Sequence, residues 1–297
     1  MLNVLVGTLY SGEQEFDQCV DALTHQHYCH RSHFIIEHMA EKAAHEQLYD
    51  RFMHNAGEYD LFLKLDADMI LTDPGSLGAA VALFEESPEL DHAVFSVQDW
   101  MTDSAILGIH MYRSRVRWAR HDDVLFTDTP PELKGTRRYF TRGAPSPLAD
   151  HGPEPTPAQA FHHGLLLGLK AFQNGVPESR PAQAFTHWRL LKRLWHHFDR
   201  VRERRLGLAL MAVEHVLSHT VTPDFCNYTN TRFWQTFGMY ETMTPDQMCR
   251  QLQPMWQRPV RRELTWLRSF MRQLGHRPRK PRAMPKLLPL PTRRKAG

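Results

Sequence analysis

Residues 59–71 constrain the fold more than any other stretch of this sequence. An apolar run leads here to Asp66 and Asp68, which are separated only by Ala67. A near-continuous apolar run of this length is typical of a strand that is buried on both faces of a sheet. Aspartate fits a buried strand poorly unless a partner or a metal ion compensates it. The pair therefore predicts a ligand site at the carboxyl end of this strand, where open α/β sheets bind their ligands.

Strands and helices alternate through the first hundred residues. The apolar patterns predict four strands, over Leu2–Leu9, Phe34–Ile36, residues 59–71 and Ala93–Val97. Between them, helical spacing predicts three helices, which begin at Glu13, cover residues 40–56, and run from an N-cap at Asp73 to about Glu86. This alternation is typical of an α/β fold with a mostly parallel, doubly wound central sheet flanked by helices.

The pattern is less regular between residues 100 and 155. Ile106–Tyr112 and a segment near Arg138–Arg142 are candidate strands, and Arg113–Arg120 is either a turn or a basic helix. Prolines and glycines predict a long loop region from Thr127 to Pro157. Long irregular stretches in a compact domain are usually functional or mobile.

The C-terminal half is predicted to be helical up to a basic tail. Helices are expected from Thr156-Pro157, over Ala182–His219 as one long helix or a hairpin, and over Pro245–Leu252 and Pro259–Leu274. Phe225–Tyr240 is aromatic-rich and is expected to be irregular. We expect a nucleotide-binding and catalytic core over residues 1–175, a helical extension over 176–275, and a flexible proline-rich tail over 276–297.

Composition narrows the class of protein. The apolar fraction is 42% and the charged fraction is 23%, as in ordinary soluble globular proteins. No apolar run approaches the roughly 18–20 residues of a membrane helix, and no signal segment precedes the first strand. The four cysteines show no zinc spacing, which predicts reduced thiols. We expect a cytoplasmic chain that is mature as written.

The tail carries a charge that the rest of the chain does not. Residues 276–297 contain eight Lys and Arg and no acid. The rest of the chain has 28 basic and 33 acidic residues, so the body of the protein has a net charge of −5. The tail suits an anionic membrane surface at the inner face of the membrane, or it is a solubilising segment without a partner. A nucleic-acid partner is not expected, because the body is acidic.

Several features of residues 3–71 match one known enzyme family. Val4–Tyr10 is followed by an acid, Glu13, and then by a leucine and a glutamine at Leu23 and Gln26. With the acidic pair at the third strand, this pattern resembles the donor half of family 2 glycosyltransferases, which have the GT-A fold. Glu37 stands where that family usually has aspartate, and the Asp-Gly-Ser that normally follows is missing.

The resemblance implies a Rossmann-like GT-A core that transfers a sugar from a nucleotide-diphosphate donor. The nucleotide would be bound by Thr8, Tyr10, Glu13, Glu37 and Asp66. Charge develops on the diphosphate as it leaves, and Mg²⁺ or Mn²⁺ offsets such charge. The resemblance implies a metal site at Asp66, Asp68 and His151. The alternative is that one aspartate caps the following turn, the other is solvated, and His151 is simply exposed.

An inverting transferase also needs a carboxylate base for the acceptor hydroxyl. The family often supplies it from a Glu-Asp pair, and this sequence has none. The candidates are Asp150, Asp123 and Asp122. The adjacent histidines at 162–163 and 196–197 lack the spacing of a helical zinc site, so structural roles are expected for them.

The leading hypothesis is a metal-dependent, inverting, hexosyltransferase-like enzyme. Its acceptor would be a saccharide or a lipid-linked sugar, in surface polysaccharide or glycolipid synthesis. A first alternative is a non-catalytic GT-A-like protein that binds a membrane surface or assists polysaccharide assembly. A second alternative is a phosphatase of the haloacid dehalogenase type, which also places Asp-x-Asp after a strand. That group uses the first strand and a hydroxyl residue two places on, where this chain has Ile70.

Overall fold

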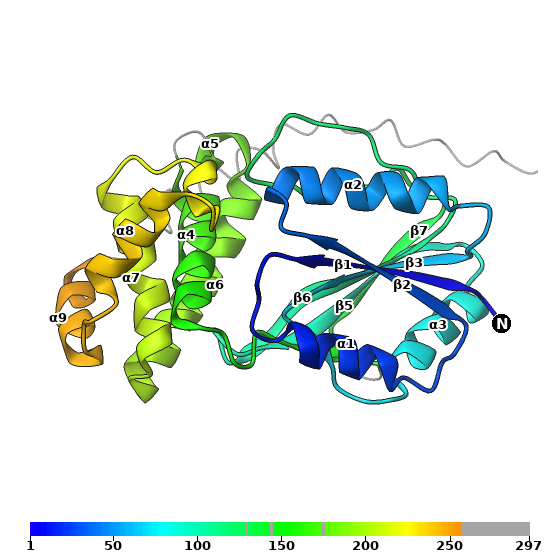
Figure 1. The fold of residues 1–297 in the computed structure, drawn as a ribbon, viewed down its shortest axis with the longest axis horizontal. Coiled ribbons are helices and arrows are strands. Elements are labelled where there is room, and N and C mark those ends of the chain that lie inside the picture. The colour runs from blue at the N-terminus through cyan, green and yellow to red at the C-terminus, as the bar shows by residue number, and fades with distance from the viewer. Residues whose placement is uncertain (129, 143–144, 174–175, 257–297) are drawn as a thin grey trace, which may run out of the picture.

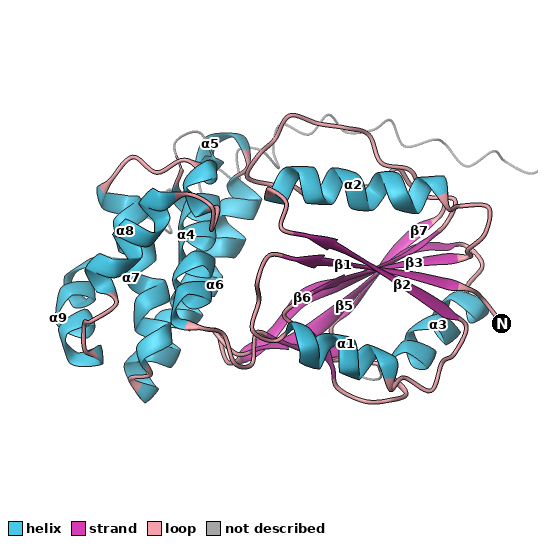
Figure 2. Cartoon of the chain, viewed as in Figure 1, coloured by secondary structure: helices cyan, strands magenta, loops and turns pink. Residues whose placement is uncertain are grey.

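A mixed β-sheet lies at the centre of the computed structural model, which describes residues 1–128, 130–142, 145–173 and 176–256 (Figures 1 and 2). In this part of the chain the sheet has eight strands in the order β2-β1-β3-β6-β5-β8-β4, and β7 pairs with β5. The strands are β1 Val4–Tyr10, β2 Arg31–Glu37, β3 Leu61–Asp66, β4 Met69–Leu71, β5 Leu90–Asp99, β6 Ser104–Arg113, β7 Thr136–Phe140 and β8 Ala149–His151.

The expectation of a mostly parallel sheet needs correction. β1 is parallel to β2 and β3, and β5 is parallel to β7 and β8. However, β6 is antiparallel to both β3 and β5, and β4 is antiparallel to β8. For β5 and β6 the reason is the short turn at residues 100–103, because a connection of that length joins antiparallel neighbours only. Residues 59–71 also form two strands, β3 and β4, which are separated by a turn at Ala67-Asp68.

Helices cover both faces of the sheet, as the alternating pattern predicts. α2 (Glu41–His54) lies over one face, and α1 (Phe16–Thr24) and α3 (Ser76–Glu86) lie over the other (Figure 1). On the α2 face, Phe52 stacks on Phe62 with ring centroids 4.8 Å apart. The other core contains Leu61, Leu63 and Leu65 of β3. Side chains along β3 therefore alternate between the two cores.

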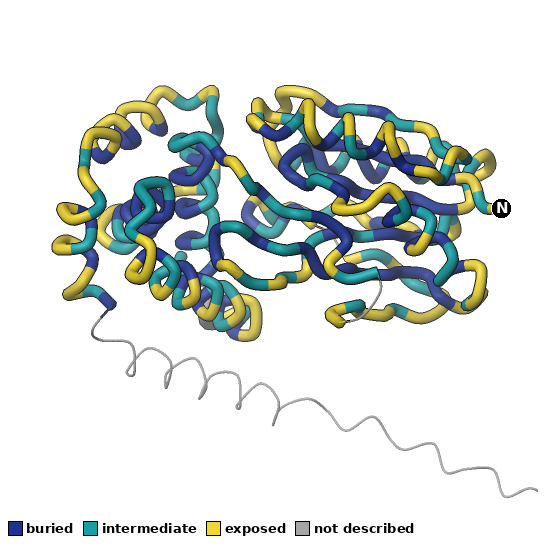
Figure 3. The backbone as a smooth tube through the Cα atoms, turned by 90° about the horizontal axis from the view of Figure 1, so that it is seen from below, coloured by how far each residue is buried: buried dark blue, intermediate teal, exposed yellow. Residues whose placement is uncertain are grey.

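A separate helical core follows. It is formed by α4 (Pro157–Phe172), α5 (Val176–Ser179), α6 (Pro181–Val201), α7 (Arg204–Ser218), the short 3₁₀ helix η1 (Pro223–Cys226), α8 (Thr231–Tyr240) and α9 (Pro245–Trp256). Figure 3 shows that buried residues lie along the helices of this part as well as along the strands of the sheet. α4 lies before the domain boundary expected after residue 175, and it packs with α7, which lies after that boundary. Within the described helices, none has the length and apolar character needed to cross a membrane.

The helical signals of the second half were mostly correct. The predicted start of α4 is confirmed, since Thr156 and Gln159 form a reciprocal capping box. The long helical segment is a hairpin, in which Arg202 adopts the left-handed conformation with φ 54° between α6 and α7. Trp188 and Phe198 are buried in the core of this hairpin.

Two local predictions were wrong. Phe225–Tyr240 was expected to be irregular, but most of it forms α8. The Asn230 side chain caps the first turn of this helix, and aromatic residues recur along the buried side of the helix. α3 begins at Ser76 instead of directly after Asp73, whose carboxylate accepts the Gly75 N–H at 2.7 Å. Of the two alternatives for Arg113–Arg120, the turn is the one observed: Arg113 ends β6, and residues 114–115 form the turn. The helix expected at Pro259–Leu274 and the tail at 276–297 lie outside the described residues.

Candidate active site

Strand ends bring a group of acids and histidines to one edge of the sheet. Asp66 ends β3, Asp99 ends β5 and His151 ends β8. β5 and β8 are parallel, and Asp99 lies opposite His151 in their register. β3 runs in the same direction as β5, because β6 is antiparallel to both. The carboxyl ends of these strands therefore meet at a single edge, which is where α/β sheets bind ligands.

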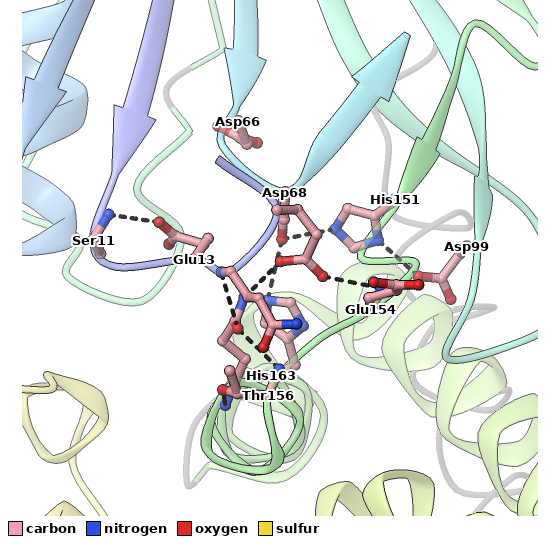
Figure 4. Close-up of polar contacts among 12 residues, drawn as sticks. Ser11, Glu13, Asp66, Asp68, Asp99, His151, Glu154, Thr156 and His163 are labelled. Atoms are coloured by element: carbon pink, nitrogen blue, oxygen red, sulfur yellow. Dashed lines mark hydrogen bonds and ion pairs between the residues drawn. The ribbon is translucent and has the colours of Figure 1, made fainter. Parts of the chain in front are cut away.

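Asp68 is the centre of this group (Figure 4). Its carboxylate oxygen Oδ2 lies 3.5 Å from His151 Nε2 and 3.4 Å from His163 Nε2. The aspartate side chain is only 8% exposed, so its charge is held in a largely desolvated place. The peptide N–H of Gly152 also donates to the Asp68 carbonyl at 2.8 Å, which joins the turn after β3 to the end of β8. Two imidazoles thus converge on one buried carboxylate oxygen.

Asp99 orients the first of these histidines. His151 donates from Nδ1 to Asp99 Oδ1 at 2.7 Å, and the other Asp99 oxygen accepts from the backbone and side chain of Thr102 at 2.8 and 2.5 Å. Burial raises the pKa of Asp99, but these hydrogen bonds outweigh it and lower the pKa below its usual value. Burial lowers the pKa of His151, whereas Asp68 and Asp99 raise it to about 9. A carboxylate that fixes the far nitrogen of an imidazole is the usual support of a metal-ligating histidine.

Asp66 has different neighbours from Asp68. It accepts a hydrogen bond at 3.1 Å from the ammonium of Lys64, which is 4% exposed. The same ammonium lies 3.3 Å from Asp128, and Tyr49 donates its hydroxyl proton to Asp128 at 2.9 Å. Burial lowers the pKa of Lys64, but Asp128 and Asp66 outweigh this and raise it, so the side chain stays charged. Figure 4 shows Asp66 apart from the contacts around Asp68.

The loop between β1 and α1, which carries Ser11 and Glu13, lies on the other side of Asp68 from Asp99 (Figure 4). Glu15 is fully buried, and it accepts hydrogen bonds from the Gln159 side chain at 2.9 Å and the Glu154 N–H at 3.2 Å. These contacts tie the loop to the first turn of α4. Glu13 accepts the Ser11 N–H at 2.6 Å. Burial raises the pKa of Glu13 to about 7, and Asp68 and Asp66 add to the effect.

The other residues expected to bind the nucleotide have varied surroundings. Thr8 is fully buried, and its hydroxyl lies 2.9 Å from His33 Nε2. The ring of Tyr10 stacks on Phe16 at a centroid distance of 4.1 Å. Glu37 is exposed at the end of β2. Their contact with a nucleotide remains a prediction.

The three candidate bases are not grouped together. Asp150 is next to His151 in β8, and strand alternation places its side chain on the opposite face of the sheet. The Asp123 carboxylate accepts hydrogen bonds from the N–H groups of Leu125 and Phe126, each at 2.9 Å. It also forms an ion pair with Arg180. Asp122 is fully exposed, and its carboxylate lies 3.9 Å from the ammonium of Lys42. The identity of the base remains a prediction.

The structure also brings in residues that the sequence did not indicate. His163, expected to be structural, lies beside Asp68, and Asp99 supports His151. Asp99 had a usable signal, since like Asp66 it is an acid at the end of a buried strand. His163 had none, because its position depends on how α4 packs against the sheet edge.

The donor set bears on which metal ion could bind. Throughout the described parts of the chain, no group of three or more His, Cys, Asp or Glu is already arranged to hold a metal ion. Asp68 nevertheless has the Nε2 atoms of His151 and His163 within 3.5 Å of one carboxylate oxygen, which gives a set of one carboxylate and two imidazoles. Mg²⁺ prefers oxygen ligands, whereas imidazole suits transition metals. The chemistry of this set fits Mn²⁺ better than Mg²⁺.

Comparison with known proteins adds little to this geometry. No protein-family model matches the chain, and no curated protein sequence matches it. Among solved structures, the crystal structure of S. aureus TarS 1-349 is similar over 81% of this chain and 90% of that chain. The sequence identity is 12% and the TM-score is 0.32, and a likeness at that level carries no functional argument.

Proposed function

We propose that this chain is a metal-dependent glycosyltransferase with a GT-A core, which uses a nucleotide-diphosphate sugar as donor. The observation that carries the proposal is the convergence of His151 and His163 on Asp68 at the carboxyl edge of the sheet. The resemblance of residues 3–71 to family 2 glycosyltransferases supports it. A phosphatase of the haloacid dehalogenase type would not need two histidines at this carboxylate.

Different residues at this edge would bind different parts of the donor. Asp68, His151 and His163 would hold a divalent ion, preferably Mn²⁺. When bound, that ion would offset the charge that develops on the leaving diphosphate. Glu13 and Asp66 would contact the nucleoside. Of the base candidates, Asp150 is nearest in sequence to His151.

The acceptor and its location are proposed from the resemblance and from the charge of the tail. We propose a saccharide or lipid-linked acceptor in surface polysaccharide or glycolipid synthesis. The basic segment 276–297 would bring the enzyme to an anionic membrane surface. Binding to anionic vesicles should then weaken with added salt and disappear when this segment is removed.

A thermal-shift screen tests the donor site. UDP, GDP, CDP and ADP are each added with and without Mn²⁺. We expect one diphosphate to raise the Tm only when Mn²⁺ is present, because saturation at 100 times Kd adds about 2.7 kcal/mol of stability. Asp68→Asn should abolish the shift, and Asp103→Asn, an exposed aspartate in the turn after β5, should keep it. If no diphosphate stabilises the wild-type protein, the transferase proposal is wrong and the non-catalytic alternative is favoured.

A further inference from the structure

A row of aromatic rings leads away from the candidate metal site. The ring of His163, which lies beside Asp68, has the ring of His162 next to it on α4, with centroids 5.9 Å apart. The His162 ring lies 4.7 Å from that of Tyr228, in the loop between η1 and α8, and Trp234 of α8 follows at 6.2 Å. We call His162, Tyr228 and Trp234 the aromatic row.

The helical core holds the aromatic row in place. Phe233 is fully buried, and it contacts Tyr228 and Trp234 edge-on at centroid distances of 5.3 and 5.1 Å. Phe161 of α4 packs edge-on against Phe233 at 5.9 Å, where α8 lies beside α4 (Figure 1). The indole N–H of Trp234 donates to the Tyr228 carbonyl at 2.8 Å. Trp234 is nevertheless 48% exposed, so a large ring with a fixed orientation is open to a ligand.

The aromatic row also offers polar atoms to a ligand. Burial lowers the pKa of His162 to about 3, so its imidazole is neutral and has one donor and one acceptor. Burial raises the pKa of the Tyr228 hydroxyl, and the negative charges of Glu13 and Asp68 raise it further, so the hydroxyl keeps its proton. Within the described parts of the chain, no group hydrogen-bonds to this hydroxyl or to the His162 nitrogens, and these atoms are open to solvent.

The charges near the aromatic row disfavour an anionic ligand. Glu13 and Asp68 are close enough to act on Tyr228, and both would repel a negative group there. Among the described residues, no arginine or lysine lies over a ring of the row. Lys170, whose charge acts on His162, lies about two turns further along α4. A carboxylated or phosphorylated group would therefore find no counter-charge against these rings.

A neutral saccharide matches this combination of surfaces. A sugar ring presents C–H groups on its faces, and these are attracted to the negative face of an aromatic ring. The hydroxyl groups at its edge need donors and acceptors, which Tyr228 and His162 supply. The other ligand that stacks on such rings is a nucleobase, and the test below distinguishes the two.

We propose that the aromatic row binds a neutral saccharide acceptor, with one end of the saccharide beside His163 and the rest along Tyr228 and Trp234. As an acceptor site, it rests on the proposed function. The site gives the helical part of the chain a task in recognition, since α4 and α8 supply its rings.

The test compares saccharide binding with diphosphate binding. The wild-type protein, with and without Mn²⁺ and the diphosphate selected by the thermal-shift screen, is applied to an array of neutral and acidic glycans. The tightest ligand is then titrated by calorimetry into Trp234→Ala, Trp234→Tyr and Tyr228→Phe. The control is Met239→Ala, which removes another exposed apolar side chain of α8, 64% exposed and five residues further along the helix. Each variant is also tested in the thermal-shift assay.

We expect the wild-type protein to bind at least one neutral glycan and no acidic one. Trp234→Ala should weaken this binding by about 10-fold or more, as for an aromatic residue at the centre of a binding surface. Trp234→Tyr should keep most of the affinity because an aromatic face remains, and Met239→Ala should keep all of it. Tyr228→Phe, which removes only a hydroxyl group and preserves the packing, should weaken binding several-fold. All variants should keep the rise in Tm with the diphosphate and Mn²⁺.

The outcomes separate this inference from the proposed function. If the diphosphate binds but no neutral glycan does, or if Trp234→Ala and Tyr228→Phe bind the glycan as the wild-type protein does, the inference is wrong and the transferase proposal stands. If Trp234→Ala loses the diphosphate-dependent rise in Tm while its urea denaturation is unchanged, the rings hold the nucleobase and the inference is again wrong. If a neutral glycan binds through the row but no diphosphate binds, the transferase proposal is wrong, and the row is the saccharide site of the non-catalytic alternative.

Discussion

Replacing Asp99 by asparagine tests the support of the proposed metal site. The substitution keeps the shape of a side chain that is 5% exposed, but it replaces one carboxylate oxygen by an amide. The two Asp99 oxygens accept from His151 on one side and from Thr102 on the other. An asparagine must therefore present its NH₂ group to one of them. Facing His151, the amide would donate to Nδ1 and force the imidazole proton onto Nε2, the nitrogen that points at Asp68.

The expected size of the effect follows from these contacts. A hydrogen bond to a charged group contributes about 1.5–3 kcal/mol, and each 1.4 kcal/mol is tenfold in a binding constant. Loss of comparable outer contacts costs metal sites about 10–100-fold in affinity. Asp99→Asn should therefore weaken Mn²⁺ binding by about 10–100-fold at pH 7.5, measured by calorimetry. The control is Asp103→Asn, whose side chain is half exposed and pairs with Arg200.

The refuting result is specific. If Asp99→Asn binds Mn²⁺ within threefold of wild type while urea denaturation shows an intact fold, His151 does not depend on Asp99 for its tautomer. The metal role of His151 would then lose its structural support.

Two further predictions concern packing and pH. Gly164→Ala should lower the free energy of unfolding by about 1–3 kcal/mol or more, because the new Cβ would lie 2.0 Å from the Ala209 carbonyl oxygen. Urea denaturation should show no loss for Gly238→Ala, which meets nothing within 4 Å and gains helix propensity. In metal-free buffer, the free energy of unfolding should fall as the pH rises from about 4.5 to 7. Burial raises the pKa of Glu13 in the folded state from 4.5 to about 7, so over this range the unfolded chain ionises Glu13 more readily than the folded one. Glu13→Gln should flatten this part of the Tm–pH curve and the exposed Glu58→Gln should not, and a slope unchanged in Glu13→Gln would contradict the assignment.

Local sequence patterns were enough for most of the elements. The strands near residues 4, 34, 61 and 93 and the three helices of the first half follow from apolar spacing, which reflects burial of one face or both. The capping signal at Thr156 placed the start of α4 because such contacts are local. Strand direction was harder to predict. The antiparallel β6 depends on a short turn in a region with few clear signals, and the α8 segment looked irregular because aromatic residues conceal its helical period.

The candidate site divides in the same way. The sequence by itself determined that two acids stand at the end of a buried strand, since one residue of spacing and an apolar run are enough to place them there. Only the tertiary structure decided that Asp66 meets Lys64 and that Asp68 meets His151 and His163. His151 and His163 come from β8 and α4, so packing of separate elements sets their distances from Asp68, whereas Lys64 lies two residues before Asp66 in β3. The electrostatic surroundings that distinguish one acid from the other are therefore properties of the folded chain.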